Sequence, residues 1–234
     1  MPSDAPGRHA VVTGTSSGIG RAIAEALLGD DWQVIGIDRA GAALEHARLT
    51  AVTADLTVPG AVEDLLSRVD TPHAIVHAAG FMRTGALGAI DVDDGEAMWR
   101  LHAGAATRLA NALLPRMVEA GRGRMVLIGS RASQGMPERS QYAASKAALI
   151  ALARSWAAEV VTRGVTVNLV SPAATDTAML ADPNRAATRP RLPPIGRLIR
   201  PEEVAALVLF LLSDSAAAIT GQDIVICGGA SLLR

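Results

Sequence analysis

Short apolar runs rich in Val and Ile alternate along the chain with longer Ala- and Leu-rich stretches of helical period. Such short runs are typical of buried parallel strands, and such longer stretches are typical of the helices that connect them. We expect strands near residues 9–12, 33–37, 49–53, 74–77, 124–128, 166–170 and 223–226. We expect helices near residues 19–28, 61–69, 95–120, 142–163 and 201–212. The alternation predicts an α/β fold: a doubly wound parallel sheet of about seven strands, flanked by helices as a three-layer sandwich.

The chain shows no internal repeat, low-complexity tract or linker, so we expect residues 1–234 to form a single domain. Residues 176–200 break the regular pattern, because they are rich in Pro, Arg and Ala and follow an expected strand. Loops in that position often bind ligands, so we interpret this segment as a substrate lid. A solvated basic loop is the simpler interpretation of its arginines. The alternative is that one of three closes over an anionic substrate group: Arg185, Arg189 or Arg191.

The 22 Lys and Arg residues nearly balance 23 Asp and Glu, which leaves a net charge of −1. Nucleic acids and anionic membranes are bound by clustered cations, so neither partner is expected. The single cysteine, Cys227, excludes an internal disulfide and a cysteine-rich metal site. The N-terminus lacks an apolar signal segment, and the longest aliphatic run, residues 204–212, is too short to span a bilayer. We therefore expect a soluble, cytoplasmic protein.

Two histidines, His73 and His77, lie four residues apart on an expected strand. That spacing brings two imidazoles onto one face in a helix, where it is typical of zinc sites, but not in a strand. We interpret both as core or loop-edge histidines, and the sequence predicts no metal site.

The first expected strand leads into a glycine-rich turn, Thr13-Gly14-Thr15-Ser16-Ser17-Gly18-Ile19-Gly20, and then into a helix. Glycines there permit a tight turn and let backbone N–H groups approach a pyrophosphate at the positive end of the helix dipole. Asp38 ends the second expected strand, where a carboxylate accepts hydrogen bonds from ribose hydroxyls and repels a 2′-phosphate. Ser17 precedes Gly18 where a basic residue would help bind that phosphate, although Arg39 follows Asp38. The pattern favours NAD over NADP.

The same turn also matches G-x-S-x-G, the elbow that presents a nucleophilic serine in α/β-hydrolases. Ser16 would then be the nucleophile. The acid and histidine that such a serine needs have no supporting context further along the chain, so dinucleotide binding is the better-supported interpretation.

The only tyrosine of the chain, Tyr142, lies four residues before its only lysine, Lys146. On a helix this spacing places both side chains on one face. A phenol is a poor base near neutral pH, but a neighbouring ammonium favours the phenolate and lowers its pKa. Ser130, at the end of an expected strand, offers a hydroxyl to a substrate oxygen. Together the three side chains indicate proton transfer at an alcohol or carbonyl oxygen.

These motifs together resemble the short-chain dehydrogenase/reductase superfamily. The resemblance covers nearly the whole chain, and it also includes Val167-Asn168, Ser171-Pro172, Thr177, Pro194-Ile195-Gly196-Arg197, Thr220-Gly221-Gln222 and Gly228-Gly229. It implies a Rossmann-type fold and a nicotinamide cofactor that exchanges hydride with a small-molecule substrate. It also implies a homotetramer or homodimer, with the helices near residues 95–120 and 142–163 at a subunit interface.

The resemblance assigns roles to single residues. Tyr142 would be the general acid/base, Ser130 would orient the substrate oxygen, and Lys146 would lower the pKa of the tyrosine and bind the nicotinamide ribose. Asp55 matches the acid that contacts adenine, and Thr177 matches the residue that reaches the carboxamide. The expected cofactor-binding residues are Gly14, Ser16, Ser17, Gly18, Ile19, Gly20, Asp38, Arg39, Asp55, Leu56, Ala78, Ala79, Gly80, Tyr142, Lys146, Pro172, Ala173, Thr175 and Thr177.

The chain departs from the family pattern in three places. His77-Ala78-Ala79-Gly80 stands where the family usually has Asn-Asn-Ala-Gly, which keeps the close backbone approach to the cofactor but loses an amide that braces the turn. His102 replaces a helix asparagine, the fourth catalytic member, which helps to hold a water of the proton relay. The imidazole or a backbone carbonyl would have to serve that water. Ala173 replaces the usual glycine after Pro172, near the nicotinamide.

The sequence therefore predicts an NAD(H)-dependent oxidoreductase that interconverts a secondary alcohol and a ketone. Residues 175–177 and the end of the chain are similar to dehydrogenases of cyclic diols and hydroxy acids, which suggests a small cyclic or anionic hydroxy compound as substrate. They are also similar to 3-oxoacyl-carrier-protein reductases, so an enzyme of that kind using NADPH is the alternative. A further alternative is a non-catalytic NAD(H)-binding sensor, against which the complete Ser-Tyr-Lys set argues.

Overall fold

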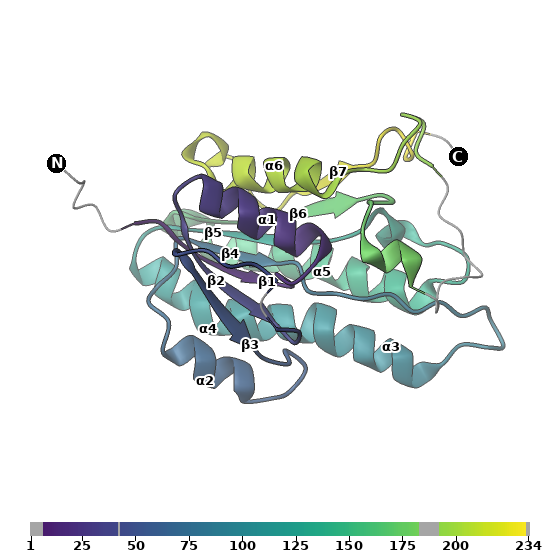
Figure 1. Cartoon of the computed structure of the whole chain (residues 1–234), viewed down its shortest axis with the longest axis horizontal. Helices are drawn as coiled ribbons and strands as arrows, with labels where there is room; N and C mark the ends of the chain where they lie inside the picture. Colours follow the sequence, from purple (N-terminus) through teal and green to yellow (C-terminus); the bar gives the residue numbers. More distant parts are fainter. Residues whose placement is uncertain (1–6, 42, 183–191, 233–234) are drawn as a thin grey trace.

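A computed structural model describes residues 7–41, 43–182 and 192–232, and these residues form a seven-stranded sheet (Figure 1). The strands are β1 (His9–Thr13), β2 (Gln33–Asp38), β3 (Leu49–Thr53), β4 (Ala74–His77), β5 (Gly123–Ile128), β6 (Val165–Pro172) and β7 (Asp223–Ile226). They lie in the order β3-β2-β1-β4-β5-β6-β7, and every neighbouring pair is parallel. The predicted doubly wound parallel sheet is confirmed, and each expected strand is present.

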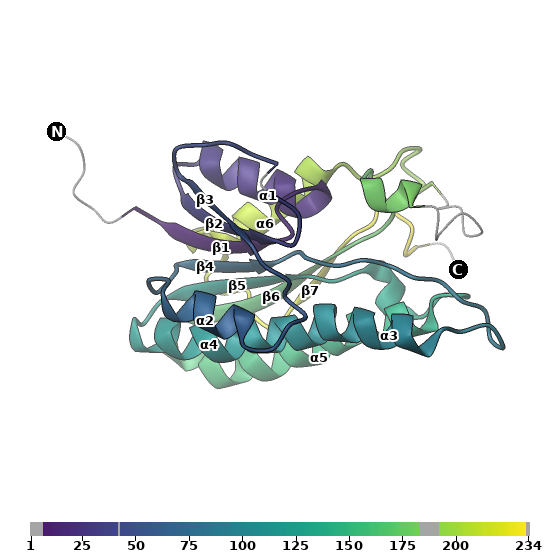
Figure 2. The same ribbon diagram turned by 60° about the horizontal axis from the view of Figure 1, so that its bottom comes forward.

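Helices cover both faces of the sheet, as Figure 2 shows. On one face lie α1 (Gly18–Gly29) and α6 (Pro201–Leu212). On the other lie α2 (Ala61–Ser67), α4 (Ala105–Glu119) and α5 (Ser140–Val160), and α3 (Val92–Trp99) continues this layer beyond α4. The three-layer arrangement leaves the carboxyl ends of the central strands uncovered by these helices.

Strand residues alternate between two apolar cores, because successive side chains of a strand point to opposite faces. In β1, Val11 packs in the core that includes α4 and α5, whereas Val12 packs in the core that includes α1 and α6. In β4, Ile75 and Val76 divide in the same way. If a strand shifted by one residue relative to its neighbours, each of its side chains would move to the opposite face of the sheet and into the other core. Packing on both faces therefore fixes the strand register, and with it where each strand ends.

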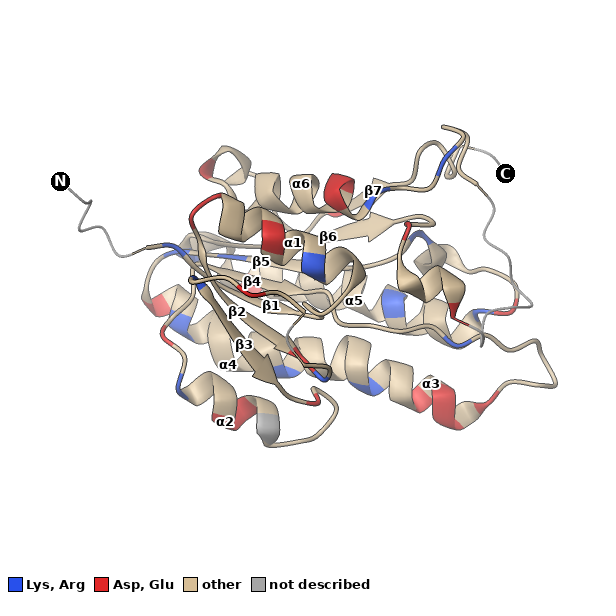
Figure 3. Ribbon diagram, viewed as in Figure 1, with Lys and Arg blue, Asp and Glu red and all other residues tan. Residues whose placement is uncertain are grey.

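One helix prediction is wrong. The stretch expected as a single helix, residues 95–120, consists of α3, a π-helical turn at Arg100–Gly104, and α4. α3 begins earlier than expected because the Asp91 carboxylate caps it, accepting from the N–H groups of Asp93 and Asp94 at 2.9 and 3.2 Å. These acids are red at the start of α3 in Figure 3. Acidic residues are favoured at the first turn of a helix, so their positions in the sequence indicate where α3 begins. Nothing in the hydrophobic period marks a π turn. The helix expected at residues 201–212 matches α6 at both ends, and the ends of the remaining expected helices differ from the structure by at most three residues.

The expected lid is described only in part. Residues 183–191 lie outside the described residues, and with them Arg185, Arg189 and Arg191. A 3₁₀ turn, Ala178–Ala181, precedes this segment. After it, Arg197 donates to both oxygens of Glu203 at 2.7 Å, and the same carboxylate accepts from the Arg200 N–H at 2.8 Å. Arg197 is therefore engaged at the start of α6.

Positive and negative side chains are interspersed along the chain (Figure 3). Some pair one helical turn apart, as Arg21 does with Glu25 and Arg100 with Glu96. Within the described ranges, no helix is long and apolar enough to cross a bilayer. The same ranges contain no group of three or more His, Cys, Asp or Glu side chains that could hold a metal ion.

Candidate active site

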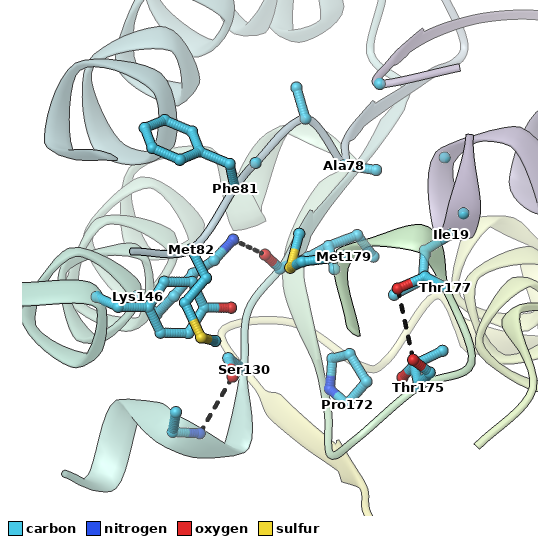
Figure 4. A pocket seen from close by; sticks show the side chains of 18 of the residues that line it. Ile19, Ala78, Phe81, Met82, Ser130, Lys146, Pro172, Thr175, Thr177 and Met179 are labelled. Carbon is cyan, nitrogen blue, oxygen red and sulfur yellow. Dashed lines mark hydrogen bonds between the residues drawn. The ribbon is translucent and has the colours of Figure 1, made fainter. Parts of the chain in front are cut away.

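A cavity of about 1180 Å³ lies at the carboxyl ends of β1, β4, β5 and β6 (Figure 4). β1 and β4 are neighbours in the sheet, although β2 and β3 lie between them along the chain. The strand order therefore reverses at this point: β2 and β3 follow β1 on one side, and β5, β6 and β7 follow β4 on the other. Open α/β sheets bind their ligands in the crevice at such a switch point. Every residue predicted to bind the cofactor lines this cavity, and so do Ser130, Tyr142 and Lys146.

The glycine-rich turn between β1 and α1 requires its glycines. Gly14 has a φ of +77°, and a Cβ there would lie 2.9 Å from the backbone of Ala79. A Cβ on Gly20 would collide with the carbonyl oxygen of Gly14. The turn can therefore pack tightly against the strand ends, and the first turn of α1 carries no acidic side chain. These features fit a pyrophosphate at the start of the helix.

Asp38 is held by backbone donors at the end of β2. Its carboxylate accepts from the N–H groups of Ser16 at 3.0 Å and Ala40 at 2.9 Å. Burial acts to raise the pKa of Asp38, but hydrogen bonds from Ala40, Ser16 and Arg39 outweigh it, so the pKa lies below its ordinary value. A fixed negative charge in this place fits neutral ribose hydroxyls better than a 2′-phosphate.

A buried hydrogen-bond network braces the turn after β4. The Thr13 hydroxyl oxygen accepts from the N–H groups of Ala78 and Ala79, both at 3.1 Å, and lies 2.9 Å from Nδ1 of His77. His77 Nε2 lies 3.1 Å from the carbonyl oxygen of Leu101, which can only accept, so Nε2 carries the proton and Nδ1 accepts from Thr13. The family amide is absent, as the sequence indicates, and Thr13 with the His77 imidazole braces the turn in its place.

Lys146 lies inside the protein and is only 5% exposed. Its ammonium donates to the carbonyl of Ile128, at the end of β5, at 2.8 Å. Burial lowers the pKa of Lys146 to about 7. Polar or anionic groups that enter the cavity will therefore shift Lys146 towards its charged form.

Ser130 and Tyr142 reach the cavity from consecutive segments. Ser130 follows β5 and caps a 3₁₀ turn, where its hydroxyl oxygen accepts from the Ala132 N–H at 3.1 Å. Tyr142 lies in the first turn of α5, one turn before Lys146, and is buried. In Figure 4, Ser130 and Lys146 lie on the opposite side of the cavity from Ile19 at the start of α1. The side chains predicted to transfer the proton are thus placed across the cavity from the glycine-rich turn.

His102 is the one predicted site residue that does not line the cavity. It is fully buried in the π-helical turn, with its ring edge-on to Tyr142 at a centroid distance of 5.7 Å. Nε2 accepts from the Phe81 N–H at 3.3 Å, so Nδ1 carries the proton and donates to Ser145 Oγ at 2.9 Å. The Ser145 hydroxyl donates to the Tyr142 carbonyl at 2.8 Å. Burial, then the Lys146 charge, keeps the pKa of His102 well below its ordinary value.

Part of the lining was not singled out in the sequence. Around Tyr142 it is apolar and rich in methionine, and it includes Phe81, Met82, Ala132, Met136 and Met179. These residues come from the segments after β4, β5 and β6, and no sequence motif links them. The sequence indicates their place in the cavity only through their positions after expected strands. The carboxyl ends of parallel strands meet at one edge of the sheet, so residues that follow them lie close together.

The fold and the site define an α/β oxidoreductase with a dinucleotide site, and comparisons with known proteins agree. A family model described as enoyl-(acyl carrier protein) reductase matches residues 14–231. The 3-oxoacyl-[acyl-carrier-protein] reductase of Salmonella typhimurium is 34% identical over 237 residues, covering 95% of this chain and 97% of that protein. The 2,3-dihydro-2,3-dihydroxybenzoate dehydrogenase of Escherichia coli is 34% identical over 251 residues, with 98% and 99% covered.

Two solved structures are similar over the same length. One, a short chain dehydrogenase/reductase family protein, superposes with a TM-score of 0.89 at 33% identity, covering 97% of this chain and 98% of the other. A 4-hydroxyisoleucine dehydrogenase complexed with NADH gives 0.87 at 25% identity, covering 97% and 100%.

The chain belongs to the short-chain dehydrogenase/reductase superfamily, which confirms the resemblance. It is an enzyme that acts on CH–OH groups of a small-molecule substrate with NAD(P). The hydrolase interpretation of Ser16 is thereby excluded.

Proposed function

We propose that the chain is an NAD(H)-dependent enzyme that interconverts a small secondary alcohol and its ketone. The observation that carries this proposal is a single cavity that is lined at once by the glycine-rich turn, Asp38, Ser130, Tyr142 and Lys146. The similarity to a dihydrodihydroxybenzoate dehydrogenase, and to a dehydrogenase complexed with NADH, supports a small hydroxylated substrate and this cofactor.

The lining fits a nicotinamide cofactor, which when bound supplies the acceptor or donor of hydride. Gly14 and the start of α1 would hold the pyrophosphate. Asp38 would bind the adenosine ribose hydroxyls, and Asp55 would contact adenine. Lys146 would bind the nicotinamide ribose, and Thr177 would reach the carboxamide.

Three side chains handle the substrate oxygen and its proton. In alcohol oxidation, the Tyr142 oxygen takes the hydroxyl proton while the Ser130 hydroxyl hydrogen-bonds the same substrate oxygen. A charged Lys146 stabilises the phenolate that Tyr142 needs for this step. In ketone reduction, Tyr142 gives the proton back to the substrate oxygen. The apolar lining around Tyr142 excludes water from the reacting oxygen.

His102 serves in this proposal as a positioning residue. Both of its ring nitrogens are engaged, and it does not line the cavity, so it is not available to a relay water there. Through Ser145 and Phe81 it ties the first turn of α5 to the loop after β4. This contact holds Tyr142 against the cofactor-binding side of the cavity.

A 3-oxoacyl-carrier-protein reductase is the second candidate function. Enzymes of that name from Salmonella typhimurium and Escherichia coli are 34% and 35% identical to the chain over 237 residues, which matches the similarity of the dehydrogenase. The two candidates differ in substrate, a thioester against a small free ketone, and in the expected cofactor.

A substrate panel read by nicotinamide absorbance separates these functions. Small cyclic ketones and keto acids, and an acetoacetyl thioester of pantetheine, are each offered with NADH and with NADPH. We expect turnover of small ketones with kcat/KM for NADH at least about tenfold above that for NADPH, a difference of about 1.4 kcal/mol. Turnover restricted to the thioester with NADPH would establish the second candidate. NADH binding without turnover of any compound would favour a sensor protein.

Replacing Asp38 by Ser should reverse part of the cofactor preference. Removal of the carboxylate deletes the ribose contacts and the repulsion of a 2′-phosphate, so the ratio of kcat/KM for NADH over NADPH should fall by about tenfold or more. Asp70→Ser, which removes the same charge from an exposed position outside the cavity, should leave the ratio unchanged. An unchanged ratio in the Asp38 variant would show that this carboxylate does not select the cofactor.

Three further predictions belong to this proposal. We propose that residues 1–234 act as a single domain, that the enzyme is a homotetramer or homodimer, and that it works in the cytoplasm. Sedimentation of the purified protein measures its oligomeric state directly. A monomer at micromolar concentration would contradict the predicted homotetramer or homodimer.

A further inference from the structure

Arg139 lies beside the residues that bind the substrate oxygen. It immediately precedes α5 and comes three residues before Tyr142, so less than one helical turn separates the two. Arg139 lines the same cavity as Tyr142 and Ser130. A substrate held at those two residues therefore lies next to the segment that carries the Arg139 guanidinium.

The Arg139 guanidinium lacks the acceptors that a partly buried cation needs. Its Nε is buried and has no hydrogen-bond partner, and Nη1 donates to the sulfur of Met136 at 3.4 Å. A thioether sulfur is a weak acceptor. Among the residues that the structure describes, no carboxylate forms an ion pair with Arg139, whereas Arg83 pairs with Asp94 and Asp182 at 3.7 and 3.1 Å. An anion that enters the cavity would give the Nη donors of Arg139 a stronger acceptor than the Met136 sulfur.

The surroundings of Arg139 define what kind of acceptor fits. Glu138 also lines the cavity, but within the described residues its carboxylate forms no ion pair with Arg139. Arg131, which follows Ser130, also lines the cavity, and an apolar cluster that includes Phe81, Met82 and Met179 packs around Tyr142. A planar cation with two parallel donors, set in an apolar lining, matches an apolar molecule that ends in a carboxylate.

We propose that Arg139 binds the carboxylate of the substrate, so that the enzyme acts on a hydroxy acid and its keto acid with an apolar body. This inference rests on the proposed function, because it names the substrate class of the same cavity. The carboxylate bound at Arg139 orients the substrate, and the alcohol or ketone carbon is thereby presented to Tyr142 and Ser130. A carrier-protein thioester has no carboxylate to offer and would leave Arg139 unpaired.

A matched pair of substrates tests the proposal: 3-oxocyclohexanecarboxylate and its methyl ester, each reduced with NADH. In the wild type, kcat/KM for the acid should exceed that for the ester by at least about tenfold, as expected for a charged hydrogen-bonded pair. Arg139→Met should abolish this preference by raising KM for the acid, and should leave kcat/KM for the ester within about twofold. Arg139→Lys keeps the charge but not the paired donors, and should retain part of the preference.

Arg163→Met is the matched control, because Arg163 is exposed at the far end of α5 and does not line the cavity. It removes the same charge and should behave as the wild type. Equal kcat/KM for acid and ester in the wild type, or a preference that survives in Arg139→Met, would overturn the proposal while the proposed function stands.

Ligand binding to the NADH complex gives a second, independent measurement. Benzoate should bind the wild type at least about tenfold more tightly than benzamide, and Arg139→Met should lose this difference. If no ketone is turned over, the proposed function fails and this binding comparison alone decides the inference. Equal binding of benzoate and benzamide would overturn it. Tighter binding of phenylphosphonate than of benzoate would also overturn it, because the site would then suit a phosphate.

Discussion

Replacing Tyr142 by Phe should lower kcat by at least about a thousandfold and leave the affinity for NADH within about twofold of the wild type. The substitution removes the oxygen that, in the proposed function, exchanges a proton with the substrate. It keeps the ring that packs with Met82, Met98 and Ala132 and lies edge-on to His102. Binding and folding are therefore preserved while the acid/base group is lost. Single-turnover kinetics and titration of NADH fluorescence measure the two quantities separately.

Ser133→Ala is the control for this variant. It also removes one hydroxyl, from the 3₁₀ turn that follows Ser130, but Ser133 does not line the cavity. Its kcat should stay within about twofold of the wild type. If Tyr142→Phe kept more than about a tenth of the wild-type kcat, another group would have to serve as the acid/base.

Acid should destabilise the protein steeply because two histidines are buried in neutral form. Burial, followed by the charge of Lys146, lowers the pKa of His77 to about 3 and that of His102 well below 6.5. The unfolded chain protonates its histidines near pH 6.5, so below that pH it binds more protons than the folded state. The free energy of unfolding should therefore fall by about 2 kcal/mol between pH 7 and 5 because of His77, and His102 should add to the loss in the same direction.

Chemical denaturation at pH 7, 6 and 5 measures this loss. The His77→Asn and His102→Asn variants should each reduce the pH dependence, because asparagine does not titrate. His46→Asn, at an exposed position, should change it little. A wild-type free energy of unfolding that stays constant from pH 7 to 5 would contradict the neutral, buried state of both imidazoles.

Local signals in the sequence were enough to predict the sheet, and each strand end to within two residues. β4 is buried along its whole length and is apolar up to His77, whereas β6, which is also buried throughout, carries Thr166, Asn168 and Ser171 among its apolar residues. The glycine-rich turn was equally readable, because Gly14 and Gly20 have no room for a Cβ. Asp38 and the pair Tyr142 and Lys146 were found from position and spacing, and the structure places all three at one cavity.

Other parts of the site depend on contacts that no local pattern records. The sequence shows that a histidine stands at position 102. It could not show that this histidine lies behind the cavity, because its two hydrogen-bond partners, Ser145 and Phe81, come from other segments. The same holds for His77, whose partners Thr13 and Leu101 come from β1 and the π-helical turn. Each partner follows from long-range packing of helices on the sheet.

The substrate side of the cavity was also beyond local patterns. The arginines that the sequence suggested for binding an anionic substrate group, Arg185, Arg189 and Arg191, lie outside the described residues. The structure instead shows that the Arg139 guanidinium lines the cavity and, within the described residues, forms no ion pair, where the sequence offers only an arginine before a helix. Its significance depends on burial and on the absence of a carboxylate partner in the described part of the chain, and neither is a property of sequence spacing.

Isotope transfer tests most directly whether this cavity catalyses exchange of hydride with a substrate carbon. The purified enzyme is incubated with NADH deuterated at both C4 positions and with a ketone from the substrate panel, and the product is analysed by mass spectrometry and NMR. We expect one deuterium on the carbinol carbon of the alcohol, formed by the wild type and at least about a thousandfold more slowly by Tyr142→Phe. An alcohol without deuterium at that carbon, or equal rates for the two proteins, would contradict the proposed function.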